Sequence, residues 1–294
     1  VVCCFGFSVL LIGYITGFFA KTIAPIVQMS ELQILLIFGG TTALYTMFGG
    51  LMGVVVTEVL HFAIMVAGCT AFMFIAVAQH GGWAEILGRI SAVRPEALTQ
   101  IPPVLAAAPD NSIALLTVLV LLLQGVFFAG SPTAGEGSTA QRFMAARNER
   151  HAMAGQLFNC FLALSFRILP LIGVGLVALS VFWPASLAKQ VPTPPGMTTI
   201  DDPVTAWAEL VNRCQLPPGL VGLLVAVEVA AYTSTLSALI NWGSSFVIND
   251  LYRPLVPRTT IRREIWVSRF TTLVLFVAAS AVAILFVKQM VGWF

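Results

Sequence analysis

Long apolar blocks dominate this sequence and limit what it can fold into. The chain has 294 residues, of which 58% are hydrophobic and only 10% are charged, whereas a soluble domain carries roughly 25% charged residues. The blocks are about 17–30 residues long, which suits helices that cross a bilayer and exceeds the roughly 10 residues of a membrane barrel strand. The sequence therefore predicts an all-α integral membrane protein.

These blocks predict about seven transmembrane helices. The predicted spans are residues 1–20, 32–48, 52–78, 113–131, 155–184, 217–248 and 265–290. A tight turn is expected at Gly49-Gly50, between the second and third spans. The 79–112 connection is expected to hold one short interfacial helix, and the 185–216 connection is predicted to be a second Pro-rich loop.

Basic residues are unevenly distributed between the connections. Residues 132–154 and 249–264 are rich in arginine, whereas the longer 79–112 and 185–216 connections together hold only Arg89, Arg94, Lys189 and Arg213. Because lysine and arginine concentrate in cytoplasmic loops, we expect 132–154 and 249–264 to be cytoplasmic. The predicted location is a multi-pass protein of the plasma membrane, of the bacterial inner-membrane type.

The chain begins inside an apolar block, with no basic segment or cleavage site ahead of it. We therefore do not interpret its start as a signal peptide. Residues 1–294 are expected to be a single transmembrane domain that is incomplete at its N-terminus and at its C-terminus. The five cysteines show no C-x-x-C or Cys/His spacing, so we predict neither a metal site nor a disulfide framework.

The most informative stretch is 219–252, where small and hydroxylated residues gather halfway along an apolar helix. At about 100° per residue, Ala231, Ser234 and Thr235 lie within one turn and share a face. A backbone carbonyl beside two hydroxyls is a hard, oxygen-only ligand set that suits a small alkali cation. The alternative is that these residues serve helix packing alone, as small and hydroxylated residues commonly do in membranes.

Glycine and proline interrupt the end of the fourth predicted span. Residues 124–137 read QGVFFAGSPTAGEG. Transporters built from inverted repeats use broken helices at the midplane, because the free backbone groups there bind substrate and ion. Gln124, Gly130 and Ser131 are therefore candidate substrate-site residues. The alternative is a plain helix end followed by a Gly-rich cytoplasmic loop.

Two ionisable residues lie inside predicted spans, Arg167 in the fifth and Glu228 in the sixth. Each lies about 15 Å from its membrane face, so their depths match. Charge inside a bilayer is costly unless it is paired or hydrated. We therefore predict that the two residues pair or line one cavity, either in an ion pathway or as a fixed structural salt bridge.

Three separate motifs resemble those of the sodium:solute symporter family. The run from Ala231 to Thr235 (AYTST), followed by Asn241 and by DLYR at 250–253, is similar to the A-x-x-S-S/T pattern, the Asn and the D-I-Y-K of the eighth core helix. Residues 141–149 (QRFMAARNE) resemble the run after the sixth core helix. Residues 45–61 (YTMFGGLMGVVVTEVLH) resemble the start of the fifth.

This resemblance implies a leucine-transporter-type (LeuT-type) fold of five-plus-five inverted repeats, of which the chain covers about core helices three to nine. It also implies that the Ala231 carbonyl and the Ser234 and Thr235 hydroxyls bind a coupling sodium ion. In the family the first core helix supplies the remaining sodium ligands, and that helix is not found in this chain.

The chain departs from the family pattern at several positions. Glu58 stands where the family has Asp, and His61 where it has Gln. Because Glu58 has the same charge as the Asp of the family, the resemblance still implies a role for it on the cytoplasmic ion exit path. The alternative is that Glu58 is simply a carboxylate at a helix end, where water reaches it. Before Gln141, Glu136-Gly137 and Pro132-Thr133 replace residues that sugar-transporting members carry, so a sugar substrate is not supported.

The leading hypothesis is a secondary transporter that couples sodium to a small solute by alternating access, with the bilayer, sodium and that solute as its partners. A membrane sensor of the same fold, or a non-transporting fragment, is the alternative. An enzyme is not predicted, because the three histidines are scattered and no H-E-x-x-H or nucleophile elbow is present. No cofactor beyond sodium and no nucleic acid partner are expected.

Overall fold

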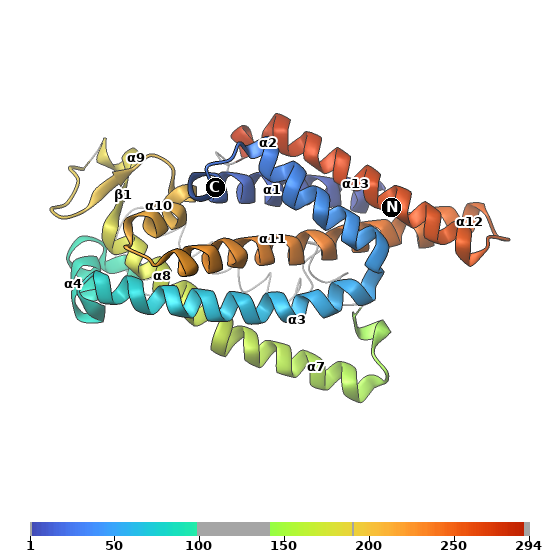
Figure 1. The fold of residues 1–294 in the computed structure, drawn as a ribbon, viewed down its shortest axis with the longest axis horizontal. Helices are drawn as coiled ribbons and strands as arrows, with labels where there is room; N and C mark the ends of the chain where they lie inside the picture. The colour runs from blue at the N-terminus through green and yellow to red at the C-terminus, as the bar shows by residue number, and fades with distance from the viewer. Residues whose placement is uncertain (1, 99–141, 190, 291–294) are drawn as a thin grey trace, which may run out of the picture.

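The computed structural model describes residues 2–98, 142–189 and 191–290. The described part is a layered bundle of long helices with short elements gathered at one end (Figure 1). Its long segments are α1 (Val2–Val27), α3 (Gly40–Gln79), α7 (Glu149–Leu162), α8 (Ile168–Val181), α11 (Pro218–Phe246) and α13 (Ile261–Met290). Five of its helical segments are long and apolar enough to span a membrane.

The segment Glu31–Gln79 forms a helical hairpin. It comprises α2 (Glu31–Ile34), the π-helical η1 (Leu35–Gly39) and α3. Its 49 residues would extend about 74 Å as one straight helix, far more than the roughly 30 Å of bilayer hydrocarbon. The direction reverses at Gly50, whose φ of 55° and ψ of −158° are not helical. The predicted turn between two spans is therefore confirmed.

The other predicted spans in the described residues also form. The fifth comprises α7, the π-helical η3 (Ala163–Arg167) and α8, and it starts at Glu149, earlier than the expected residue 155. The sixth is α11, which continues through the π-helical η5 (Val247–Tyr252) into α12 (Arg253–Leu255), and the seventh is α13. The fourth, residues 113–131, lies outside the described residues.

α11 lies at the centre of the described bundle and packs against α3, α1 and α13. Its buried side chains include Leu224, Leu236 and Ile240. Gly68 lets α3 and α11 approach closely, because a Cβ at this position would overlap the Val227 side chain. Small residues at helix crossings allow such close packing in membranes, where the hydrophobic effect contributes little to helix association.

Short elements cover one end of the bundle. They are α4 (Gly82–Val93), η2 (Pro95–Leu98), α9 (Ala185–Ala188), η4 (Pro203–Thr205), α10 (Ala206–Arg213) and the parallel strands β1 (Phe182–Pro184) and β2 (Thr198–Ile200). α4 confirms the expected short helix. The 185–216 connection is more structured than the predicted loop, because α10 buries Ala208, Leu210 and Val211.

An ion pair between Lys21 and Asp202 joins α1 to the 185–216 connection at this end. Partial burial by itself raises the pKa of the Asp202 carboxyl, but hydrogen bonds from Lys21 and from the Val204 N–H outweigh it and hold the pKa below its usual value.

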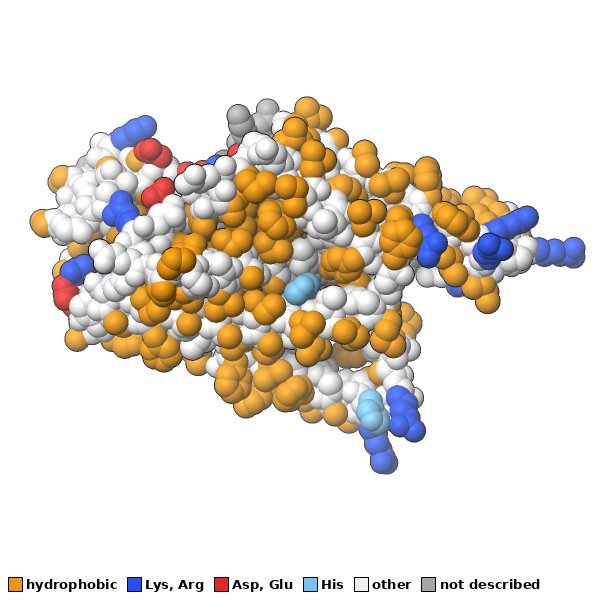
Figure 2. All heavy atoms as spheres, viewed as in Figure 1, with side chains coloured by type: hydrophobic (Ala, Val, Ile, Leu, Met, Phe, Trp, Pro, Cys, Tyr) orange, Lys and Arg blue, Asp and Glu red, His pale blue; other side chains and the backbone are white. Residues whose placement is uncertain are grey.

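The two ends of the bundle differ as the charge pattern predicts. The turn at Gly50, the start of α7 and α12 lie at one end, and α4, α9 and α10 lie at the other (Figure 1). Lysine and arginine side chains project from the first end, and no acidic ones are seen among them in this view, whereas both charges mix at the second (Figure 2). The first end carries the 142–150 and 249–264 arginines, so it matches the expected cytoplasmic side.

Gly50→Ala is expected to destabilise the protein by about 1–3 kcal/mol, because its backbone conformation is almost closed to residues with a Cβ. Gly49→Ala is the matched control, since Gly49 has no positive φ and a Cβ there meets no atom within 4 Å. Thermal unfolding of both variants in detergent measures the difference. Equal melting temperatures would contradict a turn that depends on Gly50.

Candidate functional site

Two adjacent residues fix the rotation of α11 at its centre. The Tyr232 hydroxyl shares a hydrogen bond of 3.2 Å with Thr16 of α1, and its ring stacks on Phe19 with centroids 4.1 Å apart. The Thr233 carbonyl accepts a hydrogen bond of 3.1 Å from Tyr45 of α3. Because successive residues are about 100° apart on a helix, these contacts hold α11 against α1 and α3 at one level.

The predicted ligand residues lie on another side of the same turn. The Thr235 hydroxyl donates to the Ala231 carbonyl over 3.0 Å, which places these two oxygens together. Ala231 and Thr235 are exposed and Ser234 is half-buried, so no helix of the described part covers this face. In the described residues the Ser234 hydroxyl forms no hydrogen bond, which leaves it available to a ligand.

This arrangement provides hard oxygen ligands on one turn of a rigid helix. The Ala231 carbonyl retains acceptor capacity beyond the Thr235 hydrogen bond, because a carbonyl oxygen has two lone pairs. Three oxygens are fewer than a metal ion usually takes, so further ligands must come from elsewhere. Among the described residues no cluster of His, Cys, Asp or Glu suggests a transition-metal site instead.

Glu58 of α3 forms an ion pair with Arg142, which lies just before α7. The Glu58 side chain is 21% exposed, so the pair is partly shielded from water. The Tyr45 hydroxyl lies near Thr57 and Ser237 and feels the charge of Glu58. A line of polar groups therefore extends from the Tyr45–Thr233 contact at the centre of α11 towards the arginine-rich end.

The predicted pairing of Arg167 with Glu228 is not seen among the described residues, and the alternative, that the two line one cavity, stays a prediction. Arg167 is exposed at the end of η3, whereas Glu228 is half-buried on α11, and no ion pair joins them among the salt bridges of the described residues. The segment that carries Arg167 packs against α3, and so does α11. Two residues at the same depth in the membrane pair only if their side chains also face each other, and depth alone does not show that.

Glu228 does lie on the predicted side of α11. It precedes Thr235 by seven residues of continuous helix, which places it on the same face about 10 Å away. The candidate substrate-site residues Gln124, Gly130 and Ser131 lie outside the described residues.

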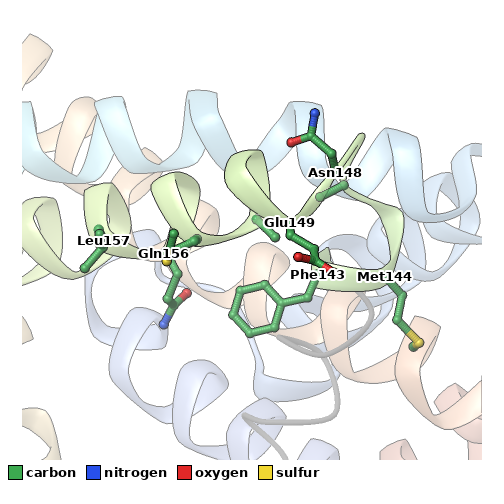
Figure 3. Close-up of a pocket in the computed structure, with 9 residues that line it drawn as sticks. Phe143, Met144, Asn148, Glu149, Gln156 and Leu157 are labelled. Carbon is green, nitrogen blue, oxygen red and sulfur yellow. The ribbon is translucent and has the colours of Figure 1, made fainter.

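A prominent hollow in the described part belongs to a different region. It has a volume of about 690 Å³ and lies around the start of α7, where Phe143, Met144, Glu149, Gln156 and Leu157 are among its lining residues (Figure 3). None of its lining residues comes from α11 or α3. It is open and mostly apolar, so it is not the cation site predicted from Ala231, Ser234 and Thr235.

Two features of the site were not predicted from sequence. Arg142 was interpreted as part of an arginine-rich connection and of the 141–149 motif, yet it is also the partner of Glu58. Tyr45, Thr16 and Tyr232 hold α11 in position, although their sequence signal is weak. The one usable signal was a polar group inside an apolar span, since such groups need partners on neighbouring helices.

Comparisons with known proteins agree on one family. A family model described as "Sodium:solute symporter family" matches residues 7–294. The chain is 28% identical over 265 residues to a sodium/mannose cotransporter of Bos taurus, covering 80% of this chain and 40% of that protein. It is 24% identical over 268 residues to the sodium/pantothenate symporter of Haemophilus influenzae, covering 91% of this chain and 49% of that protein.

A solved structure has the same fold. It is a substrate-bound, outward-open Na⁺-coupled sialic acid symporter, with a TM-score of 0.74, 18% identity, and coverage of 98% of this chain and 58% of that chain. This confirms the fold expected from the sequence. The chain spans 40% and 49% of the lengths of the two curated relatives described above.

A double-mutant cycle on Glu58→Gln and Arg142→Gln is expected to be non-additive by about 1 kcal/mol, because each single change leaves a partly buried charge without its partner. Unfolding of the purified protein in detergent provides the free energies. The control cycle combines Glu58→Gln with Arg147→Gln, which removes an exposed arginine of the same segment. Additive losses in the Glu58–Arg142 cycle would contradict the pair.

Proposed function

The chain belongs to the sodium:solute symporter family, and on that premise we propose that the protein moves a small solute across the membrane by coupling it to sodium. Transport proceeds by alternating access, in which the two sides of the membrane reach the site in turn. The relatives found are transporters and not enzymes. Because the chain spans less than half of the two curated relatives, the transport activity is assigned to the complete protein.

The observation that carries the proposal is the oxygen group on α11. The Ala231 carbonyl and the Thr235 hydroxyl lie 3.0 Å apart on an uncovered face, with Ser234 in the same turn. Hydroxyl and carbonyl oxygens suit a hard monovalent cation and leave no role for a soft metal. Sodium then needs two or three more oxygens from segments that face this side of α11.

Glu58 is proposed to lie on the route by which sodium leaves towards the cytoplasm. It stands between the arginine-rich end and the polar groups around Tyr45. The Arg142 pair shields its charge, so opening the route requires this ion pair to separate. Glu228, on the face of Thr235, is proposed to line the same pathway on the other side of the site.

The solute is a small molecule whose class is left open. By name, the relatives act on mannose, pantothenate and sialic acid, so one scaffold accepts chemically different solutes. The residues expected to contact the solute, Gln124, Gly130 and Ser131, are the part of the site that would discriminate between them.

The protein is an integral, multi-pass membrane protein. We propose the bacterial inner membrane as its location, supported by the bacterial symporter that matches 91% of the chain. Residues 132–154 and 249–264 are proposed to face the cytoplasm, because the described arginines of both segments project from the same end of the bundle (Figure 2).

Removing both hydroxyls with Ser234→Ala and Thr235→Ala is expected to raise the sodium concentration for half-maximal uptake at least about tenfold, because each lost charge-assisted contact is worth about 1.5–3 kcal/mol. Solute uptake into proteoliposomes, driven by an imposed sodium gradient, measures this for the protein expressed from its complete reading frame. Solutes are first screened with the unaltered protein.

The matched control is Ser244→Ala with Ser245→Ala. It removes two hydroxyls from the same helix, about 15 Å further along, and both bond to carbonyls of α11 itself. Unchanged sodium dependence in the first double variant, with uptake intact, would rule out these ligands.

Single cysteines introduced in a cysteine-free background are expected to report the orientation. Arg258→Cys should react with an impermeant maleimide only after the cells are permeabilised, whereas Ser91→Cys on α4 should react in intact cells. Both positions are exposed. The reverse labelling pattern would overturn the assignment of the arginine-rich end to the cytoplasm.

A further inference from the structure

A shallow apolar groove runs between α13 and the first half of α3. It has a volume of about 150 Å³ and is lined by Gly40, Ala43, Leu44 and Met47 of α3 and by Thr272, Leu273 and Phe276 of α13. Leu44 and Leu273 remain about half exposed, at 54% and 49%. The groove is therefore open at the surface of the described bundle.

An arginine lies at one end of this groove. Arg269 is one turn of α13 before Leu273, towards the arginine-rich end of the bundle. Its guanidinium carbon lies 5.2 Å from the ring centroid of Phe48 and 5.3 Å from that of Trp266. Phe48 directly follows Met47, which lines the groove. The guanidinium of Arg269, which lies over the Phe48 and Trp266 rings, is therefore close to the end of the groove.

Among the described residues, Arg269 has no acidic partner. Its Nε is buried and has no hydrogen-bond acceptor, and no ion pair in the described part includes it. Glu264, the acidic residue of the same helix, is bound to Arg253. A buried guanidinium N–H without an acceptor is unusual in a folded protein, so this cation is available to an anion that comes from outside the chain.

A second arginine shares its side of the helix. Arg262 precedes Arg269 by seven residues, two turns, which places it on the same face about 10 Å nearer the end of α13. Trp266 lies between them and is 62% exposed. Arginine and tryptophan at the end of a membrane helix typically occupy the headgroup region of the bilayer.

We propose that this groove binds one anionic phospholipid of the cytoplasmic leaflet. The acyl chain lies along the groove between α3 and α13, and the headgroup phosphate accepts hydrogen bonds from the Arg269 guanidinium. Arg262 adds a second positive charge, which favours a headgroup of net negative charge over a zwitterionic one, as basic clusters beside membrane helices do. A hydrophilic solute does not fit the proposal, because the lining of the groove is apolar except for Thr272, which is only 4% exposed. The site is independent of the sodium site.

Native mass spectrometry of the purified complete protein tests the proposal. It is titrated with dioleoyl phosphatidylglycerol, with dioleoyl phosphatidylcholine and with inorganic phosphate. Phosphatidylglycerol is expected to bind with one tight site, about tenfold tighter than phosphatidylcholine, because Arg269 and Arg262 repel the choline cation of the second lipid. Arg269→Gln is expected to weaken phosphatidylglycerol binding about tenfold, since a charge-assisted hydrogen bond to phosphate is worth about this much. Inorganic phosphate is not expected to bind, because it lacks the acyl chain.

Two further variants separate the parts of the site. Arg263→Gln removes an equal charge from α13 about 120° away from Arg269 and should leave the tight site unchanged. Gly40→Leu is expected to fill the groove and to weaken both lipids, and a Cβ at Gly40 meets no atom within 4 Å. Melting temperatures without added lipid show that each variant folds.

Two outcomes would overturn the proposal. If Arg263→Gln and Arg269→Gln weakened phosphatidylglycerol binding equally, the lipid would be responding only to the overall positive charge at this end of the bundle. Unchanged phosphatidylglycerol affinity in both Arg269→Gln and Gly40→Leu would exclude the groove.

Discussion

The orientation of α11 depends on contacts made by two neighbouring residues. Tyr232 binds α1 through Thr16 and Phe19, and Thr233 binds α3 through Tyr45. Lipid is as apolar as leucine, so burial of apolar surface does little to set the rotation of a membrane helix, and close packing and hydrogen bonds must do it. With two sides of α11 held in this way, Ala231, Ser234 and Thr235 occupy the remaining side.

The low polarity of the bilayer also explains how charged side chains are accommodated near the arginine-rich end. A charge inside a bilayer requires a partner, water or a polarisable surface. Glu58 uses Arg142 as its partner, and Arg269 lies beside two aromatic rings whose faces attract cations. Glu228 has no ion pair within the described residues, and it lies on the face of α11 that carries the candidate ligands. The described residues thus show three arrangements: an ion pair, a cation beside aromatic rings and a carboxyl without an ion pair.

Sequence patterns were reliable for features that depend on local chemistry. Hydrophobic block lengths predicted the spans, and the Gly49-Gly50 pair marked the reversal that the structure places at Gly50. The motif around residue 231 placed three oxygens on one turn, which follows from helix geometry alone. The expected Arg167–Glu228 pair is not seen among the described residues, because depth along a helix is a one-dimensional quantity and pairing also requires the two helices to face each other.

The sequence by itself determined that the chain is a multi-pass helical membrane protein, where its hairpin turns, and which residues share a face with Ser234. These properties follow from hydrophobic length, backbone freedom and the helical period, all of which are local. Only the tertiary structure decided that Arg142 neutralises Glu58, that Arg167 and Glu228 form no ion pair in the described residues, and that Arg269 meets Phe48 beside an apolar groove. Those outcomes depend on how each helix is rotated about its axis, and that rotation is set by contacts between residues far apart in the chain.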